Sequence, residues 1–277
     1  MRPRLDLSDG AAVVTGAGAG IGRALARALA ARGAALALAD RDADGLAETA
    51  RQCGAADVSQ HVLDVTDADA VAALPDAVRR AHGRATVLVN NAGTSVVGRA
   101  EEVSDEELRW LFDVNFFAVA ALTRAFLPTL RAQPQAAVAN VSSVFGLLAP
   151  AEQAAYAATK FAVRGWSEAL RHELEGTGVA VTVVHPGGVK TGITAASRVA
   201  AAADPDWAAA STARFEEGAL RLTPERAAHA IVRAIERRRP RVLIGADARL
   251  ADALQRAAPG RYWAAARSTF RRFTVDR

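Results

Sequence analysis

The segment Tyr156-Ala157-Ala158-Thr159-Lys160, with Ser143 upstream, carries side chains that could move a proton. On a helix, a spacing of four residues places the tyrosine and the lysine on one face, within reach of each other. A free phenol titrates near ~10, and a neighbouring positive charge lowers that pKa toward neutral. A serine hydroxyl nearby could hold a carbonyl or alcohol oxygen against the phenol. The pattern favours proton exchange with a substrate oxygen, although such pairs are also common on ordinary surface helices.

A glycine-rich segment near the N-terminus predicts a phosphate-binding loop. The segment 15–22 reads Thr-Gly-Ala-Gly-Ala-Gly-Ile-Gly, follows the apolar run 11–14 and precedes a stretch rich in helix formers. Glycines permit a tight turn and a close backbone approach, and a helix N-terminus presents N–H groups to a pyrophosphate. A second apolar run at 34–39 ends in Asp40, 18 residues after Gly22. That spacing is close to the roughly 20 residues expected before a carboxylate that binds an adenosine ribose.

Composition is typical of one enzyme domain in a reducing compartment. The chain has 277 residues and no Pro/Gly/Ser-rich linker, and alanine inflates its hydrophobic content of 51%. It offers no window of about 18 uncharged apolar residues, as a spanning helix would need. Cys53 is the single cysteine, so no internal disulfide can form and a cytoplasmic location is expected. The sequence has no His/Cys cluster suited to a metal, and none is expected.

Strand-like apolar runs alternate with helix-like segments along the chain. The strand candidates are 11–14, 34–39, 60–63, 85–89, 136–141, 179–184 and 241–244. The helix candidates lie near 21–32, 43–53, 67–82, 105–131, 152–175 and 224–238. The run Thr86-Val87-Leu88-Val89 shows no polar alternation, which indicates strands covered on both faces. The prediction is an α/β fold, a doubly wound, Rossmann-like parallel sheet of about seven strands with helices on both faces.

Polar residues follow several of these strands, and the carboxyl ends of parallel strands meet at one edge of a sheet. With these motifs the chain resembles the short-chain dehydrogenase/reductase family, in its common single-domain subtype, over roughly residues 8–245. The matching motifs are Thr-Gly-x3-Gly-x-Gly from Thr15 to Gly22, Asn-Asn-Ala-Gly at 90–93, Asn115, Ser143 thirteen residues before Tyr156, Tyr-x3-Lys at 156–160, and Pro-Gly-x-Val-x-Thr at 186–191.

The resemblance implies four catalytic residues. Tyr156 would be the general acid in ketone reduction and the base in alcohol oxidation. Lys160 would lower the pKa of Tyr156 and hold the nicotinamide ribose, and Ser143 would bond the substrate oxygen. Asn115 would anchor a water near Lys160 and complete a proton path to solvent. His185, beside Pro186, is expected to be structural rather than catalytic.

A nicotinamide dinucleotide is the cofactor that the residues and the resemblance predict. Asp40 at the end of the second strand favours NAD, since a carboxylate accepts bonds from a free ribose hydroxyl and repels a phosphate. Arg41 follows at once and could bind that phosphate, so NADP stays open. The predicted cofactor-binding residues are Gly16, Ala19, Gly20, Ile21, Gly22, Asp40, Arg41, Asp64, Val65, Asn91, Ala92, Gly93, Tyr156, Lys160, Pro186, Gly187, Val189 and Thr191.

The substrate is predicted to be a hydrophobic ketone or secondary alcohol. Its contacts are expected to be Ser143, Phe145, Gln153 and Tyr156. The family closes its pocket with the segment after Thr191, here an Ala-rich insert at about 192–222 that carries Trp207 and Phe215. As an alternative, Arg198 could bind a substrate carboxylate.

The C-terminal segment is strongly basic. Residues 233–277 hold twelve Arg against four acidic residues, a net of +8 against +4 for the whole chain. The expected organisation is a catalytic domain at 1–245 and a basic amphipathic extension at 246–277. That extension could pack against another subunit with its arginines in water, or lie on an anionic membrane surface; no nucleic-acid partner is predicted. The resemblance implies a homo-oligomer, a dimer or a tetramer.

These features lead to one leading hypothesis and one alternative. The leading hypothesis is an NAD(P)-dependent oxidoreductase that interconverts a ketone and a secondary alcohol by tyrosine-mediated proton transfer and hydride transfer. The alternative is an NAD(P)-binding redox sensor or a membrane-associated interaction protein that uses the basic tail. The intact set Asn115, Ser143, Tyr156 and Lys160 favours the enzyme, because a sensor has no need of all four.

Overall fold

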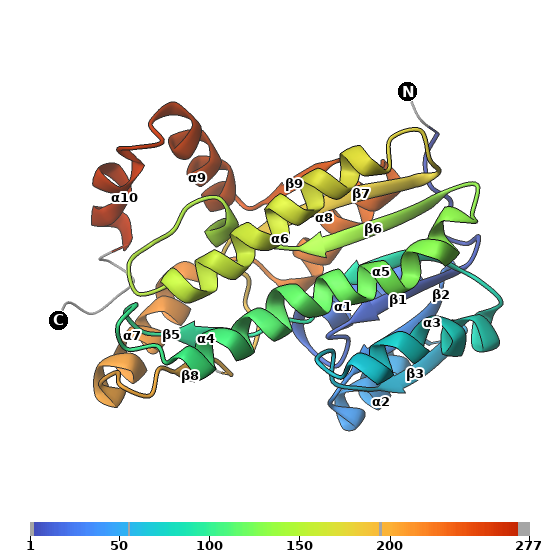
Figure 1. The fold of residues 1–277 in the computed structure, drawn as a ribbon, viewed down its shortest axis with the longest axis horizontal. Helices are drawn as coiled ribbons and strands as arrows, with labels where there is room; N and C mark the ends of the chain where they lie inside the picture. The colour runs from blue at the N-terminus through green and yellow to red at the C-terminus, as the bar shows by residue number, and fades with distance from the viewer. Residues whose placement is uncertain (1–2, 55, 194–195, 271–277) are drawn as a thin grey trace.

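The computed structural model describes residues 3–54, 56–193 and 196–270 (Figure 1). A parallel sheet of seven strands in the order β3-β2-β1-β4-β6-β7-β9 forms its centre. The strands are β1 (Ala11–Thr15), β2 (Ala35–Asp40), β3 (Val58–Val62), β4 (Ala85–Asn90), β6 (Ala136–Val141), β7 (Val179–Pro186) and β9 (Arg241–Ile244). The predicted α/β class, a doubly wound parallel sheet, is confirmed.

The central strands are buried throughout because both faces of the sheet are covered. Every residue of β1, β4, β6 and β7 is buried. The strand order reverses direction between β1 and β4, and in open parallel sheets ligands bind at the carboxyl edge beside such a switch point. The fold therefore places the ends of β1 and β4 at the expected binding edge.

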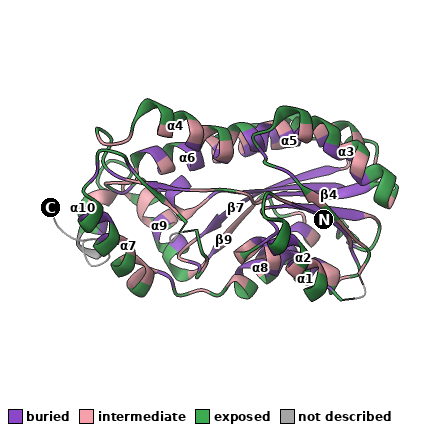
Figure 2. Ribbon diagram, turned by 90° about the horizontal axis from the view of Figure 1, so that it is seen from below, coloured by how far each residue is buried: buried purple, intermediate pink, exposed green. Residues whose placement is uncertain are grey.

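Two layers of helices cover the sheet (Figure 2). The layer of α1 (Gly20–Ala30), α2 (Ala43–Gln52) and α8 (Pro224–Glu236) packs one face with side chains such as Leu25, Leu29 and Ile231. The other layer consists of α3 (Ala68–His82), α5 (Ala118–Arg131) and α6 (Ala154–Glu173), and it buries Phe126, Leu130 and Leu170. Each helix turns one apolar stripe to the sheet, the pattern that helical periodicity predicts.

The predicted long helix 105–131 is three elements in the structure. The first is α4 (Asp105–Phe112), which opens with a capping box in which Ser104 and Glu107 bond each other's backbone N–H. A π-helical turn (Asp113–Phe117) then leads into α5. By length and composition the whole segment could cross a membrane, with a mean hydropathy of 1.4 over its best window. Its buried side chains, including Leu122 and Phe126, pack against the sheet instead.

Several short elements outside the predicted strands and helices, together with the predicted amphipathic C-terminal extension, gather beyond the carboxyl ends of the strands, on the left of Figure 1. They are the short parallel pair β5 (Val96–Val97) and β8 (Arg198–Val199), and the helices α7 (Pro205–Ala219), α9 (Ala246–Ala257) and α10 (Tyr262–Phe270). Residues 194–195 of the predicted insert and 271–277 of the predicted extension lie outside the described part of the chain.

Candidate active site

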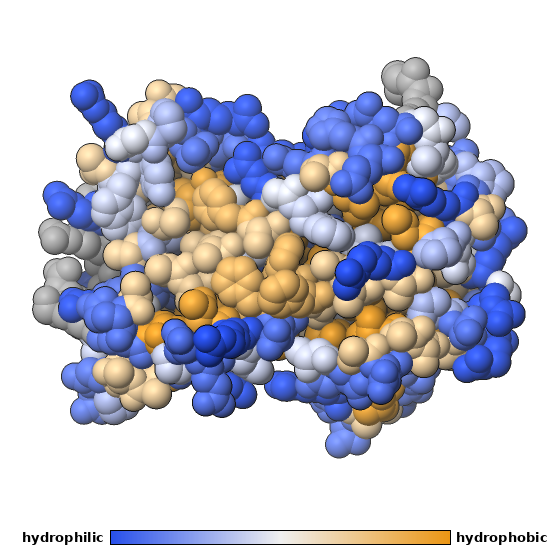
Figure 3. Space-filling view, viewed as in Figure 1, coloured by the Kyte–Doolittle hydropathy of each residue, from blue (hydrophilic) through white to orange (hydrophobic). Residues whose placement is uncertain are grey.

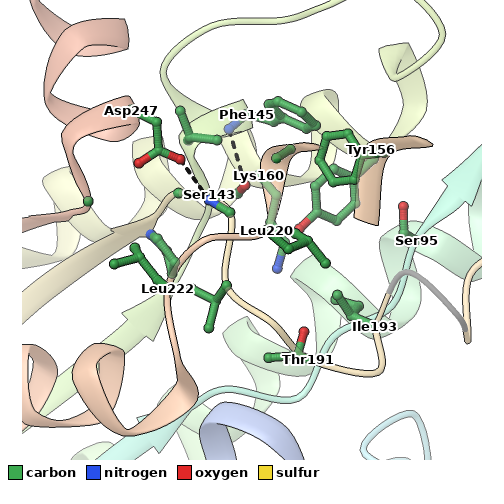
Figure 4. A pocket seen from close by; sticks show the side chains of 18 of the residues that line it. Ser95, Ser143, Phe145, Tyr156, Lys160, Thr191, Ile193, Leu220, Leu222 and Asp247 are labelled. Atoms are coloured by element: carbon green, nitrogen blue, oxygen red, sulfur yellow. Dashed lines mark hydrogen bonds between the residues drawn. The ribbon is translucent and has the colours of Figure 1, made fainter. Parts of the chain in front are cut away.

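A cavity of about 1540 Å³ opens at the carboxyl edge of the sheet. Its walls hold the glycine loop at one end and the Tyr156 region at the other, so one space joins a cofactor groove to a reaction site. Figure 4 shows Ser143, Tyr156 and Lys160 projecting into this space from two different elements, with Asp247 also in the wall. Most of the predicted site residues line it: Gly16, Ala19, Gly20, Ile21, Asp40, Asn91, Ala92, Gly93, Ser143, Phe145, Gln153, Tyr156, Lys160, Pro186, Gly187, Val189 and Thr191.

Helix α6 brings the tyrosine and the lysine together. The Lys160 Nζ atom lies 5.6 Å from the centre of the Tyr156 ring and donates a hydrogen bond to the Val141 carbonyl oxygen, at 3.2 Å. Ser143 follows β6, and its hydroxyl hydrogen-bonds the Tyr156 hydroxyl and accepts a bond from the Phe145 N–H at 3.1 Å. A substrate oxygen placed between the two hydroxyls would meet both.

Burial is the main influence on the pKa values of Tyr156 and Lys160 in the protein without a bound cofactor. It raises the pKa of Tyr156 to about 12, and the hydrogen bond with Ser143 acts in the opposite direction. It lowers the pKa of Lys160 to about 8, because the residue is only 3% exposed. The sequence-based expectation of a lowered phenol pKa is therefore wrong for the protein alone, because burial raises it.

Asn115 lies behind the reaction site, fully buried in the π-helical turn. Its amide holds Thr94 at both backbone positions: Oδ1 accepts from the Thr94 N–H at 2.8 Å, and Nδ2 donates to the Thr94 carbonyl at 2.9 Å. A β-carbon added to Gly93 would lie 3.2 Å from Asn115 Oδ1 and 3.3 Å from Lys160 Nζ. Gly93 therefore leaves room for the polar ends of both Asn115 and Lys160, which a larger residue would displace by a few tenths of an ångström.

The glycine loop is locked by backbone contacts that leave no room for side chains. A β-carbon at Gly22 would lie 1.9 Å from the Gly16 carbonyl oxygen, and Gly16 itself adopts a φ of +63°. Asn91 Nδ2 donates to the carbonyls of Thr15 and Gly16, at 3.0 and 3.2 Å. The end of β4 thus holds the loop that follows β1.

The start of α1 suits an anionic ligand. Its N-cap is Ala19, whose side chain makes no capping hydrogen bond, and Ala19, Gly20 and Ile21 all line the cavity. Helix N-termini carry unpaired N–H groups and a partial positive charge, which match a pyrophosphate. The residues present therefore fit a dinucleotide.

Asp40 closes the far end of this groove. Its Oδ2 accepts a bond from the Gly18 N–H at 2.8 Å and its Oδ1 accepts from the Asp42 N–H at 3.1 Å, which fixes the carboxylate in the cavity wall. Arg41 is exposed on the turn that follows. A ribose hydroxyl at this position would meet a fixed acceptor.

Some predicted cofactor residues lie outside the cavity lining. Gly22 packs beneath the loop, and Val65 is buried in the core under the sheet. Asp64 is exposed, and its Oδ1 accepts bonds from the Thr66 N–H and hydroxyl, at 2.9 and 2.7 Å; the backbone bond is the main reason that its pKa is low. Arg198 stacks its guanidinium 3.6 Å from the Trp110 ring, away from the cavity, which disfavours a role in binding a substrate carboxylate.

His185 supports the reaction site from beneath. It is fully buried, and its Nδ1 donates to the Ser143 carbonyl oxygen at 2.9 Å. Burial lowers the pKa of His185 to about 4, so the ring is neutral at neutral pH. In the structure His185 holds the backbone of Ser143, and its lack of a catalytic role stays a prediction.

Sequence reasoning missed one wall of the cavity. Helix α9 contributes Asp247, Ala251 and Leu254, and α10 contributes Phe270. The Asp247 Oδ2 atom accepts a bond from the Gly188 N–H at 2.7 Å, within the loop that follows β7. The four-residue spacing of Leu250 and Leu254 was a usable signal, but it equally fits a helix face that meets a membrane or a subunit.

Comparisons with known proteins agree with this geometry. The family model for short chain dehydrogenases matches residues 10–201. The SadH protein of Mycobacterium tuberculosis is 42% identical over 250 residues, which cover 88% of this chain and 89% of that one. The ketoacyl reductase HetN of a Nostoc species is 33% identical over 74% of this chain and 67% of its own. A short chain dehydrogenase/reductase from Burkholderia phymatum, solved in complex with NAD, is 33% identical with a TM-score of 0.85, covering 92% of this chain and 95% of that one.

Proposed function

The chain belongs to the short-chain dehydrogenase/reductase family, and on that basis we propose that it interconverts a hydrophobic ketone and the corresponding secondary alcohol with a nicotinamide dinucleotide. The observation that carries the proposal is the single cavity that holds both the glycine loop and the Ser143, Tyr156 and Lys160 side chains. Relatives named as ketoacyl reductase and alcohol dehydrogenase support this reaction class.

Each catalytic residue has a distinct task in this proposal. The Tyr156 hydroxyl gives its proton to the carbonyl oxygen during reduction and takes it back during oxidation. Ser143 donates a hydrogen bond to the same oxygen and stabilises the charge that develops there. Lys160 supplies a positive charge beside the ring of Tyr156. When bound, the dinucleotide supplies or accepts the hydride. A proton path from Lys160 through a water beside Asn115 stays a prediction.

The dinucleotide would lie along the glycine loop. The N-terminus of α1 would bind its pyrophosphate, Asp40 its adenosine ribose, and the segment from Pro186 to Thr191 its nicotinamide. We favour NAD, because the fixed carboxylate of Asp40 repels a ribose phosphate. Structural relatives bind both forms: one is in complex with NAD and others with NADP or a derivative of it.

We also propose that the protein pairs with a second copy of itself. Figure 3 shows apolar side chains gathered on the face where α4, α5 and α6 lie in Figure 1. Exposed apolar residues there include Leu108, Phe117 and Phe161, 37%, 56% and 37% exposed. This face would pair two copies of the chain in a homo-oligomer. Membrane contact through the basic C-terminal segment, a cytoplasmic location, and the division at residue 245 stay predictions.

The test is reduction of a panel of ketones, followed by loss of NADH or NADPH absorbance. The wild-type protein should turn over at least one hydrophobic ketone. Tyr156→Phe should lower kcat by a factor of about 10² to 10⁴, since it removes the proton donor. It should still bind NADH, as measured by quenching of protein fluorescence. Full activity of Tyr156→Phe would contradict the assigned role of the tyrosine.

A further inference from the structure

One face of α9 continues the cavity wall away from Tyr156. Asp247, Leu250, Ala251 and Leu254 all line the cavity and follow the spacing i, i+3, i+4, i+7 of a single helix face. At a rise of about 1.5 Å per residue, this row extends along roughly 10 Å of helix. Its inner end is polar and its outer part is apolar.

The row is held in place at two points along the helix. At the inner end, the Asp247 carboxylate accepts the bond from Gly188, and a β-carbon at Gly187 would lie only 2.0 Å from it. Farther along, Asp252 pairs with Arg241 of β9 at 2.5 Å. The wall is therefore a fixed part of the fold, joined directly to the loop predicted to hold the nicotinamide.

Helix α10 and the segment after β6 complete this wall with aromatic and aliphatic groups. Phe145 lies between the two helices and the reaction site: its ring centre is 6.1 Å from that of Tyr156 and 6.1 Å from that of Phe270. Ala251 packs in the same cluster. The Tyr262 hydroxyl accepts a bond from the Ala149 N–H at 3.2 Å, which ties α10 to the opposite side of the cluster.

The exposure of Leu250 indicates what the wall binds. It is 62% exposed although it lines the cavity, which makes it one of the most exposed large apolar side chains among the described residues. Covering such a side chain releases apolar surface from water and is favourable. The cavity that contains Tyr156 is continuous with Leu250, so a molecule that reacts at Tyr156 could cover it.

We propose that the α9–α10 wall binds an unbranched apolar chain carried by the substrate, with the ketone at Tyr156 and the chain along Leu250, Ala251 and Leu254. This inference rests on the proposed function and narrows its substrate to ketones with a long alkyl or acyl chain. A row on one straight helix face fits a linear chain better than a broad ring system. Asp247 is then a positioning residue, since it couples the chain-binding helix to the nicotinamide loop.

The first experiment measures binding separately from turnover. Tyr156→Phe, saturated with NADH, is titrated calorimetrically with methyl ketones from butanone to dodecanone. Each methylene buried by the wall should tighten Kd by up to about fourfold until the row is filled. A Kd that does not change with chain length would overturn the inference. Tightening with length, combined with no turnover by the wild-type protein, would support the wall and contradict the proposed function instead.

The second experiment locates the chain on α9. Leu254→Trp fills the outer part of the row, and it should reduce the preference for dodecanone over butanone by at least tenfold. Ala253→Trp is the matched control, because Ala253 is exposed on the same helix and lies away from the cavity lining. Leu254→Ser, which adds no bulk, should reduce the same preference if the Trp variant folds poorly. An unchanged preference in a folded Leu254 variant would overturn the inference.

Discussion

Lys160 and Tyr156 share one face of α6, with the Lys160 Nζ atom 5.6 Å from the centre of the tyrosine ring, and burial opposes the charged form of both. The ammonium has one protein partner of note, the Val141 carbonyl at 3.2 Å, and no acidic side chain is paired with it among the described residues. A buried charge with so little compensation destabilises the fold. The burial of Lys160 therefore costs stability, as expected of a residue whose proposed role is chemical.

Replacing this lysine should stabilise the protein while it abolishes activity. The pKa of Lys160 falls from 10.5 to about 8 on folding, so at pH 7 the charged side chain lowers the free energy of unfolding by up to about 3 kcal/mol. Lys160→Met removes the charge at nearly constant volume. The melting temperature of the variant without cofactor should therefore rise at pH 7.

The pH dependence of this rise in melting temperature tests the explanation more directly. Because the folded pKa lies below the unfolded one, the penalty is complete below about pH 8 and disappears as pH rises to 10.5. The difference in melting temperature between variant and wild type should narrow over that window. Lys190→Met is the control, since Lys190 is exposed. A gain that stays constant from pH 7 to pH 10 would contradict the explanation.

Much of the fold could be predicted from local sequence. The apolar runs that became β1, β4 and β6 lack polar alternation because both faces of the sheet are covered, and the missing alternation together with the short length of the runs indicates buried strands. The interruption of the 105–131 helix could not be seen. The π-helical turn contains Asn115, whose amide bonds Thr94, and this contact joins segments 21 residues apart.

The candidate site, like the fold, has parts that the sequence predicts and parts that only the structure shows. Residues in the glycine loop and the Tyr-x3-Lys segment have local spacing rules, so the sequence identified them. The α9 wall has a helical spacing from Leu250 to Leu254, but that spacing does not show what the helix packs against. Asp247 and Gly188 are 59 residues apart in the sequence, and only the folded chain brings them together. The pKa of Tyr156 was also beyond sequence reasoning, because burial, the larger effect, depends on everything packed around the ring.

A single methyl group added to the glycine loop should weaken cofactor binding. In Gly22→Ala the new β-carbon would lie 1.9 Å from the Gly16 carbonyl oxygen, a backbone atom that cannot move without displacing the loop. We expect Kd for NADH to rise at least tenfold. Gly165→Ala is the control: nothing lies within 4 Å of its β-carbon and it sits on an exposed helix position, where it should stabilise the fold by about 0.5–1 kcal/mol. Equal NADH affinity in both variants would contradict this account of the loop.

Cofactor preference should depend on the Asp40 carboxylate. Like charges brought together cost several kcal/mol, and ~1.4 kcal/mol corresponds to a factor of ten. Asp40→Ser should therefore raise the ratio of kcat/KM for NADPH over NADH by at least tenfold, with Arg41 free to bind the phosphate. Asp42→Ser makes the same change in net charge at the N-cap of α2 and should leave the ratio within about twofold. An equal shift in both variants would mean that overall charge, rather than Asp40, sets the preference.

His185 should make the protein sensitive to mild acid. Burial is the main reason that its pKa falls from 6.5 to about 4; Arg241 and Arg164 add to the fall, while the bond to Ser143 and the charge of Glu168 oppose it. The unfolded chain binds the proton first as pH drops. Stability is therefore complete above about pH 6.5 and falls by up to about 3 kcal/mol as pH approaches 4.

The measurement is the urea midpoint of unfolding from pH 7 to pH 4 for the wild type, His185→Asn and His229→Asn. Asparagine at 185 keeps an N–H donor for the Ser143 carbonyl but does not titrate, so this variant should lose stability at pH 7 and lose less than the wild type toward pH 4. His229 is exposed, and its variant should follow the wild-type curve. If the curves of the wild type and His185→Asn stay parallel down to pH 4, His185 takes up its proton in the folded state. The conclusion that its imidazole is buried and neutral would then be wrong.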